Sequence, residues 1–207
     1  RGHTIHLSAD REESLGGADL VERLAARYPA VTVGWTPGRQ SGAWADLGRQ
    51  LRLGIDYLRF LDPRYDATPR LRGRSEERTP ALVLWLTRSA VLRTPGGRRV
   101  LGWVLRQFEQ AVPRSRELKA YYQEHAPDVV LITPLVDLGS PQLDHYVSAR
   151  ALGLRTVVCV GSWDHLSSKS LIREMPDRVF VWNETQKREA VELHRVPAER
   201  VAVTGAQ

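Results

Sequence analysis

The polar stretch from Ser162 to Lys169 holds the side chains best suited to chemistry in this chain of 207 residues. It follows an apolar, β-rich run at 156–160 that stops abruptly at Gly161. In sheets of parallel strands, ligands bind in the crevice outside the carboxyl ends of the strands. Hydrogen-bonding and aromatic residues directly after a buried strand therefore form a candidate site. Its members are Ser162, Trp163, Asp164, His165, Ser167, Ser168 and Lys169.

Neighbouring predicted strands also end in polar turns. The strand at 179–181 is followed by Trp182-Asn183-Glu184, and the strand at 201–203 by Thr204-Gly205. Asp137 and Ser140 follow the strand at 129–133 and are expected to face the same cleft. Asn183 has a second interpretation, because Gln186 three residues later completes a capping-box pattern for a helix reaching 193.

The elements that must position these residues alternate along the chain. Alternating strands and helices predict an α/β fold, a mainly parallel sheet flanked by helices. Strands are expected at 4–9, 31–35, 129–133, 156–160, 179–181 and 201–203. Helices are expected at 18–27, 44–61, 79–93, 98–124 and 142–152 and after Asn183, and Pro113 is expected to divide or kink the longest. Residues 62–78 are expected to be loop, and the apolar run at 129–133 is typical of a strand buried on both faces.

Composition and missing motifs exclude several function classes. Hydrophobic residues make up 42% of the chain, which favours one globular domain, and the single Cys159 permits no internal disulfide. The sequence lacks the glycine fingerprint of dinucleotide binding, the phosphate loop and the serine-hydrolase elbow. His3 and His6 would face opposite sides of a strand, so no metal site is expected. His125 and His194 fall at helix ends, where capping or solvation is expected.

Positive charge is concentrated in the middle of the chain. Between Arg70 and Arg116 there are eleven arginines and three glutamates, a net charge of +8 against +6 for the whole chain. The same window carries apolar residues and tryptophans at helical spacing. Such helices can pack their apolar faces on the domain and leave their arginines in water, or they can lie on an anionic membrane surface. Nucleic acid is not expected as a partner, because no recognition motif accompanies the charge.

Residues 128–207 resemble the amino-terminal half of bacterial glycosyltransferases with two facing Rossmann-like domains, the GT-B architecture. The resemblance rests on Ser-Trp-Asp-His-Leu-Ser-Ser-Lys, on Pro176-Asp177, on Val-Trp-Asn-Glu and on Val-Thr-Gly-Ala-Gln. The opening Arg-Gly-His-Thr-Ile-His-Leu resembles the end of the first helix of such domains. The chain is most similar to enzymes of capsule and teichoic-acid polymers, and UDP-N-acetylglucosamine 2-epimerases share the architecture.

The resemblance implies that residues 1–207 form a single Rossmann-like domain, truncated at both ends, with a basic helical insertion at about 70–124. A missing first strand would lie between the strands at 4–9 and 129–133, so the sheet is expected to be weakened or gapped there. A missing carboxy-terminal domain would bind most of the nucleotide-sugar donor, so the chain alone is expected to be inactive. The donor is a substrate, and no cofactor is expected.

The function implied is that of an acceptor-side domain, which helps to transfer a sugar from a nucleotide sugar to a cell-surface polymer or lipid-linked acceptor. Inverting transfer needs a base, and Asp164, His165 or Asp137 would serve. Lys169 would neutralise a phosphate, or else is surface charge. Trp163 would stack on a sugar ring or be buried under the loop, and Asp164 would otherwise cap its turn. The remaining substrate-binding candidates are Ser162, Ser167, Ser168, Ser140, Asn183 and Glu184.

Two alternatives remain open at this point. The chain can belong to a UDP-sugar 2-epimerase-like enzyme, or it can be a non-enzymatic α/β binding module. The downstream sequence of the gene would separate them. The expected location is cytoplasmic, peripheral to the inner face of the membrane.

Overall fold

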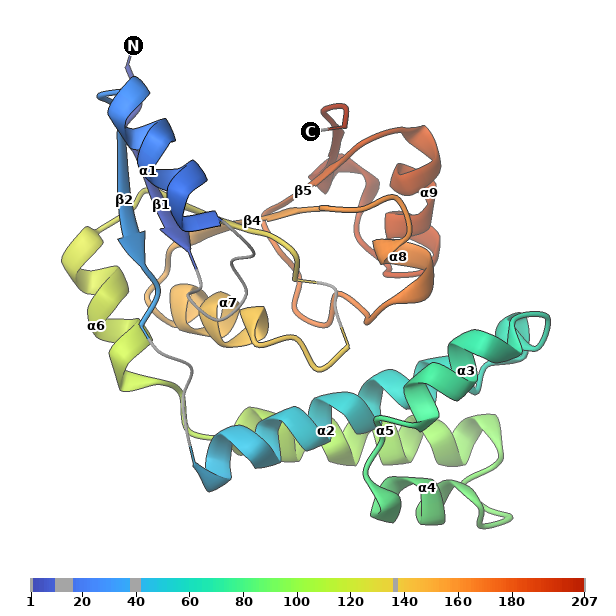
Figure 1. Cartoon of the computed structure of the whole chain (residues 1–207). Coiled ribbons are helices and arrows are strands. Elements are labelled where there is room, and N and C mark those ends of the chain that lie inside the picture. Colours follow the sequence, from blue (N-terminus) through green and yellow to red (C-terminus); the bar gives the residue numbers. More distant parts are fainter. Residues whose placement is uncertain (1, 10–16, 38–41, 136–137, 207) are drawn as a thin grey trace. The chain divides into compact units, whose positions relative to one another are not determined.

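The computed structural model describes residues 2–9, 17–37, 42–135 and 138–206 (Figure 1). The chain divides into two compact units, Arg1–Arg39 and Gln40–Gln207. In the first unit, strand β1 (Ile5–Ala9), helix α1 (Gly17–Arg27) and strand β2 (Val31–Trp35) form a β-α-β unit. The two strands pair in parallel, with Ile5 opposite Val31. The strands and helix expected at 4–9, 18–27 and 31–35 are therefore confirmed.

The second unit contains a four-stranded parallel sheet. Its strands are β3 (Val129–Ile132), β4 (Arg155–Cys159), β5 (Arg178–Val181) and β6 (Val201–Val203), and they lie side by side in chain order. Helices α7 (Gln142–Ala151), α8 (His165–Ser168) and α9 (Glu184–Glu192) connect them. Tyr146, Val158, Leu166 and Val179 form the centre of the core that joins helices and sheet. The unit is thus a Rossmann-like α/β fold, as predicted.

The strands were expected to form one mainly parallel sheet, weakened or gapped between the strands at 4–9 and 129–133. The described strands form two separately hydrogen-bonded sheets, β1-β2 and β3-β4-β5-β6. The absence of pairing between the two groups of strands agrees with the weakened or gapped sheet that the resemblance implies. No described strand pairs with both sheets, so hydrogen bonding between strands does not join them.

Strand β3 is not buried on both faces, which corrects the prediction made from its apolar run. Val130 and Ile132 pack into the core with α7, whereas Val129 is 39% and Leu131 61% exposed. An apolar run shows that a strand can be covered on both sides. Whether it is covered depends on which elements pack against each face.

Five helices precede the sheet of the second unit. They are α2 (Ala43–Phe60), α3 (Pro69–Glu76), α4 (Ala81–Thr87), α5 (Pro95–Ala111) and α6 (Arg116–His125). Figure 1 shows α2 and α5 side by side. Gly54 of α2 permits the close approach, since a methyl group there would lie 3.0 Å from Val83 of α4 and 3.5 Å from Leu105 of α5. The expected break at Pro113 separates α5 from α6.

The loop expected at 62–78 is instead helical over much of its length, with a short 3-10 turn at Pro63–Tyr65 followed by α3. The Asp62 side chain accepts a hydrogen bond from the Arg64 N–H, and a proline opens each element, where its missing N–H is not needed. Leu71 packs against a small core of Leu53, Phe60, Tyr65 and Leu138. Tertiary packing therefore stabilises a segment whose composition is typical of a loop.

Buried charges join these helices to the sheet. Arg52 contacts Glu109 of α5 at 3.0 Å and Asp144 of α7 at 2.5 Å. Arg173, which follows α8, contacts Asp56 at 2.5 Å and Glu109 at 3.3 Å. All but the partly exposed Asp144 are nearly inaccessible to water. The two arginines and three carboxylates form one network, so the helices and the sheet of this unit are one packed body.

No helix in the part of the chain that the structure describes is long and apolar enough to cross a membrane.

We predict that Asp56→Ala lowers the free energy of unfolding by roughly 3–5 kcal/mol, because it removes a partner from the buried Arg173. Urea unfolding measures the loss. Asp66→Ala is the matched control, since Asp66 pairs with Arg72 at 2.7 Å but is 64% exposed. Breaking such a surface pair should cost less than about 1 kcal/mol. Equal losses in the two variants would show that the network does not hold the unit together.

Candidate functional site

The carboxyl ends of the four parallel strands lie at one edge of the sheet and bring the predicted polar turns together. Gln186 of α9 joins two of them, because its side-chain amide donates to the Ser162 carbonyl at 3.0 Å. The Thr204 N–H donates to the Val181 carbonyl at 2.9 Å and holds the turn after β6 against the end of β5. The stretch from Ser162 to Lys169 therefore lies beside the turns that follow β5 and β6.

Gly161 lies two residues after the end of β4, at a point where a side chain does not fit easily. A Cβ atom there would lie 3.1 Å from the Thr133 hydroxyl oxygen and 3.6 Å from Cε1 of His165. The hydroxyl at the end of β3 and the imidazole at the start of α8 thus both approach Gly161. This close packing places His165, half-buried, at the carboxyl ends of β3 and β4.

Asp164 organises its own loop. One carboxylate oxygen accepts a hydrogen bond from the Ser162 hydroxyl and the other from the Ser168 hydroxyl, each at 2.8 Å. Partial burial by itself raises the pKa of Asp164, but these hydrogen bonds and the positive charge of Lys169 outweigh it and hold the pKa below the ordinary aspartate value. Asp164 is therefore a stabilised carboxylate and a weak base at neutral pH, which supports its turn-organising role.

The other predicted residues differ in how open they are. Trp163 is 74% exposed, so the expectation of burial under the loop is wrong and its ring is free to meet a ligand. Glu184 is exposed as well. Ser167 donates its hydroxyl to the Asp164 carbonyl at 3.3 Å. Asp137 lies outside the described residues.

Ser140 and Asn183 interact with the starts of helices. Ser140 is only 5% exposed, and its hydroxyl accepts a hydrogen bond from the Gln142 N–H at the start of α7. Asn183 caps α9, because its side-chain oxygen accepts from the Gln186 N–H at 2.9 Å. The Gln186 side chain reaches back to the Trp182 N–H at 2.8 Å, one residue before the one that a capping box uses. The capping interpretation of Asn183 is therefore confirmed.

Arg59 of α2 anchors the polar loop from Ser162 to Lys169. The sequence did not indicate this role for Arg59. Its guanidinium donates to four carbonyl oxygens at the end of α8 and to the hydroxyl of Tyr65. The carbonyls belong to Leu166, Ser167, Lys169 and Ser170, at distances from 2.7 to 3.5 Å. All five N–H donors of this buried arginine thus have acceptors. Arg74 of α3 adds a hydrogen bond to the Ser168 carbonyl at 2.7 Å.

His194 anchors the loop from the other side. It is 4% exposed, which corrects the expectation of a capping or solvated histidine. Nδ1 accepts from the Ile172 N–H at 3.0 Å, so Nε2 carries the proton and donates to the Leu166 carbonyl at 2.7 Å. Burial, followed by the positive charge of Arg59, lowers its pKa to about 4. His194 is therefore neutral and serves to position the loop.

The arrangement is suited to proton transfer beside a stacking surface. The loop backbone is held by Arg59, Arg74 and His194. The loop carries the exposed indole of Trp163 and the half-buried side chains of His165 and Lys169. Within the described residues, no three potential metal ligands lie close enough together to hold a metal ion. Comparison of the chain with protein-family models, with curated proteins and with solved structures finds no significant match.

We predict that Arg59→Lys lowers the free energy of unfolding by at least about 2 kcal/mol, because an ammonium group has three donors and leaves buried carbonyls unpaired. Hydrogen exchange should accelerate for the amides that follow α8. Arg64→Lys is the matched control, since Arg64 is exposed by about half and pairs with the exposed Asp62. Unchanged exchange in Arg59→Lys would contradict the anchoring role.

We predict that His194 makes the protein less stable as the pH falls. The unfolded chain binds a proton at His194 near pH 6.5, whereas the folded chain binds it only near pH 4. Between these values the unfolded state holds more protons, so the free energy of unfolding decreases as the pH decreases. The contribution of neutral His194 to the free energy of unfolding is complete above about pH 7. At about pH 4 roughly 3 kcal/mol of it is lost.

Urea unfolding of wild type and His194→Gln at about pH 7 and about pH 4.5 measures this effect. The variant should be less stable at neutral pH but should lose less stability on acidification, because it lacks the titrating group. Parallel pH profiles for the two proteins would contradict the prediction.

Proposed function

We propose that this chain forms the acceptor-side domain of a glycosyltransferase that transfers a sugar from a nucleotide sugar to a cell-surface polymer or lipid-linked acceptor. The observation that carries the proposal is that one loop, at the carboxyl ends of a parallel sheet, carries both an exposed indole, Trp163, and the imidazole of His165. An aromatic face packs against a sugar ring, and an imidazole can accept the proton of a sugar hydroxyl at neutral pH.

The side chains of the loop then take separate roles. His165 is the base that accepts the proton of the acceptor hydroxyl as that oxygen attacks the donor sugar. Asp164, with its lowered pKa, holds the loop together through Ser162 and Ser168. Lys169 neutralises a phosphate group of a substrate. This assignment separates Asp164 and His165, which the sequence treats as equal candidates.

The donor is a substrate, and in the enzymes that this chain resembles a second Rossmann-like domain binds it. The proposed enzyme acts in the cytoplasm, peripheral to the inner face of the membrane, where it would reach a lipid-linked acceptor.

We predict that His165→Ala in the full-length product of the gene lowers kcat by roughly 10²–10⁴-fold, the usual contribution of a general base. Its thermal melt should stay close to that of wild type. Asp164→Asn should reduce kcat less and lower the melting temperature more, because an amide cannot accept hydrogen bonds from both serines through two oxygens. His125→Ala is the control, because His125 is an exposed histidine at the end of α6 and precedes the amino end of β3.

Trp163→Ala should raise KM for the acceptor with little change in kcat, because stacking binds ground and transition states alike. Trp44→Ala is its control, since Trp44 is 55% exposed on α2. Near wild-type kcat in both His165→Ala and Asp164→Asn would place the base elsewhere, with Asp137 next to test. If Trp163→Ala abolishes acceptor binding and no form of the protein, wild type included, transfers a sugar, the non-enzymatic binding module would be favoured.

A further inference from the structure

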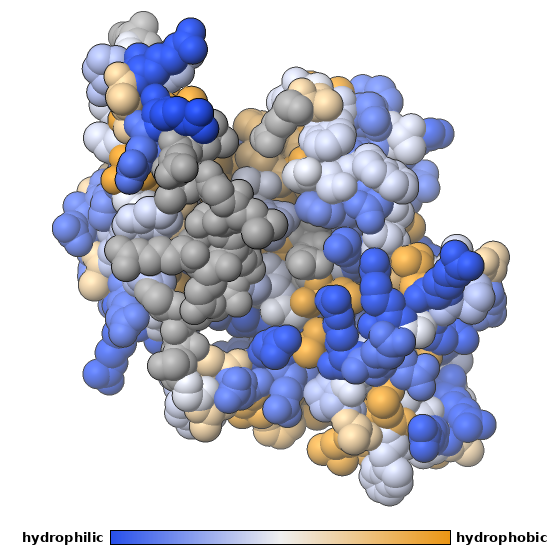
Figure 2. Space-filling view, in the orientation of Figure 1, coloured by the Kyte–Doolittle hydropathy of each residue, from blue (hydrophilic) through white to orange (hydrophobic). Residues whose placement is uncertain are grey.

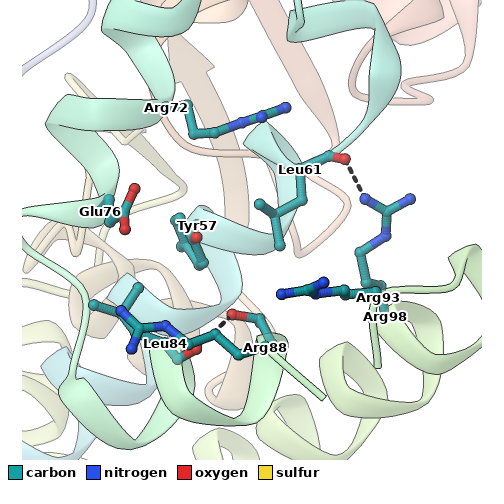
Figure 3. A pocket seen from close by; sticks show the side chains of 9 residues that line it. Tyr57, Leu61, Arg72, Glu76, Leu84, Arg88, Arg93 and Arg98 are labelled. Atoms are coloured by element: carbon teal, nitrogen blue, oxygen red, sulfur yellow. Dashed lines mark hydrogen bonds between the residues drawn. The ribbon is translucent and has the colours of Figure 1, made fainter. Parts of the chain in front are cut away.

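A cavity of about 270 Å³ lies among the helices of the second unit, apart from the sheet edge (Figure 3). Four arginines line it, namely Arg72 of α3, Arg88 and Arg93 of the turn after α4, and Arg98 of α5. The single acidic residue of its lining is Glu76. Figure 3 shows Arg72 and Arg93 extending toward the space beside Leu61 from different elements. Positive charge therefore converges on one hollow from three parts of the chain.

Two of these arginines are held in place by the protein itself. Arg72 donates to the Phe60 carbonyl at 3.0 Å and to Asp66 at 2.7 Å. Arg98 donates to the Leu61 carbonyl at the end of α2. These contacts fix the two side chains beside the cavity before any ligand arrives, which lowers the entropy cost of binding.

Arg88 and Arg93 are exposed. Neither guanidinium makes a hydrogen bond or an ion pair with another of the residues that the structure describes. Arginines gathered around one hollow repel each other unless an anion lies between them. The cavity thus combines two fixed guanidinium groups with two whose donors remain available.

We propose that this cavity binds a phosphate or diphosphate group, a function beyond the glycosyl transfer proposed above. Guanidinium groups match phosphate oxygens in pairs of hydrogen bonds, and a fixed cluster of them selects anions with several oxygens. The cavity volume lies just below the range of about 300–1,000 Å³ that is usual for pockets that bind drug-sized ligands. The space therefore suits a phosphate or diphosphate group better than an entire nucleotide sugar.

The group can come from a free phosphate compound or from a lipid headgroup. The elements that carry Arg88 and Arg93 also expose Leu82, Trp85 and Val91, each by more than half. In Figure 2, orange apolar residues are interspersed with blue charged residues over the lower helices of the molecule. Apolar side chains near a phosphate site would meet the acyl region of a bilayer, so the test includes lipid vesicles.

Isothermal titration of the 207-residue chain with inorganic pyrophosphate tests the site. Arg88→Gln/Arg93→Gln should weaken binding at least about tenfold, since it removes two charge-assisted contacts. Arg99→Gln/Arg106→Gln removes the same charge from exposed positions of α5 outside the cavity and should change affinity much less. Glu76→Gln should tighten binding, because it removes the only acidic side chain of the lining. Thermal melts establish that each variant is folded.

Sedimentation with vesicles distinguishes the sources. If the group belongs to a lipid, the chain should bind phosphatidylcholine vesicles that contain phosphatidic acid but not phosphatidylcholine alone, and Arg88→Gln/Arg93→Gln should abolish this binding. Pyrophosphate binding without vesicle binding would identify a soluble phosphate compound. Absence of binding to both probes, or equal weakening by the two double variants, would overturn the site. These readouts measure binding, so they stand apart from the turnover that tests glycosyl transfer.

Discussion

The guanidinium of Arg59 is the interaction on which the candidate site depends. The loop after β4 contains one short helical turn, α8, and Arg59 supplies donors for four carbonyl groups in and directly after this turn. Burying an arginine costs several kcal/mol in lost hydration, and five hydrogen bonds with contacts to the Phe60 and Tyr65 rings offset that cost. The Leu166 carbonyl accepts from both Arg59 and His194. The loop backbone is thereby held on two sides while Trp163 remains exposed.

The network of buried charges around Arg52 and Arg173 likewise holds loops in place through hydrogen bonds from helix α2. Asp56 pairs with Arg173 and also accepts the Gly139 N–H at 3.0 Å, which fixes the turn before α7. Gly139 has a φ of 67°, a left-handed conformation that favours glycine, and a Cβ there would lie 3.0 Å from Leu53. Helix α2 therefore contacts both the turn after β3 and the loop after β4. The helices before the sheet are part of the structure that positions the site.

This organisation divides the arginines by role. Arg72, Arg74 and Arg98 donate to backbone carbonyl groups within the unit. The expectation that the basic window leaves its arginines in water is therefore wrong for these three. Arg88 and Arg93 are exposed and border the cavity. The charge excess of the window thus combines structural arginines with those proposed to bind phosphate.

The sequence by itself determined the order and type of most elements, because strand composition, helix periodicity and capping are local properties. A few neighbouring residues were enough to predict the strands at 31–35 and 201–203, the cap at Asn183 and the break at Pro113. It also determined that the polar turns after β4, β5 and β6 lie at the same end of the sheet, since parallel strands present their carboxyl ends together. Only the tertiary structure decided that Arg59 and His194 hold the loop and that Leu131 is exposed. Arg59 lies 107–111 residues from the carbonyl groups that it binds, and nothing local distinguishes it from the other arginines. Pairings over such distances depend on how the helices pack against the sheet, which no local pattern in a single sequence specifies.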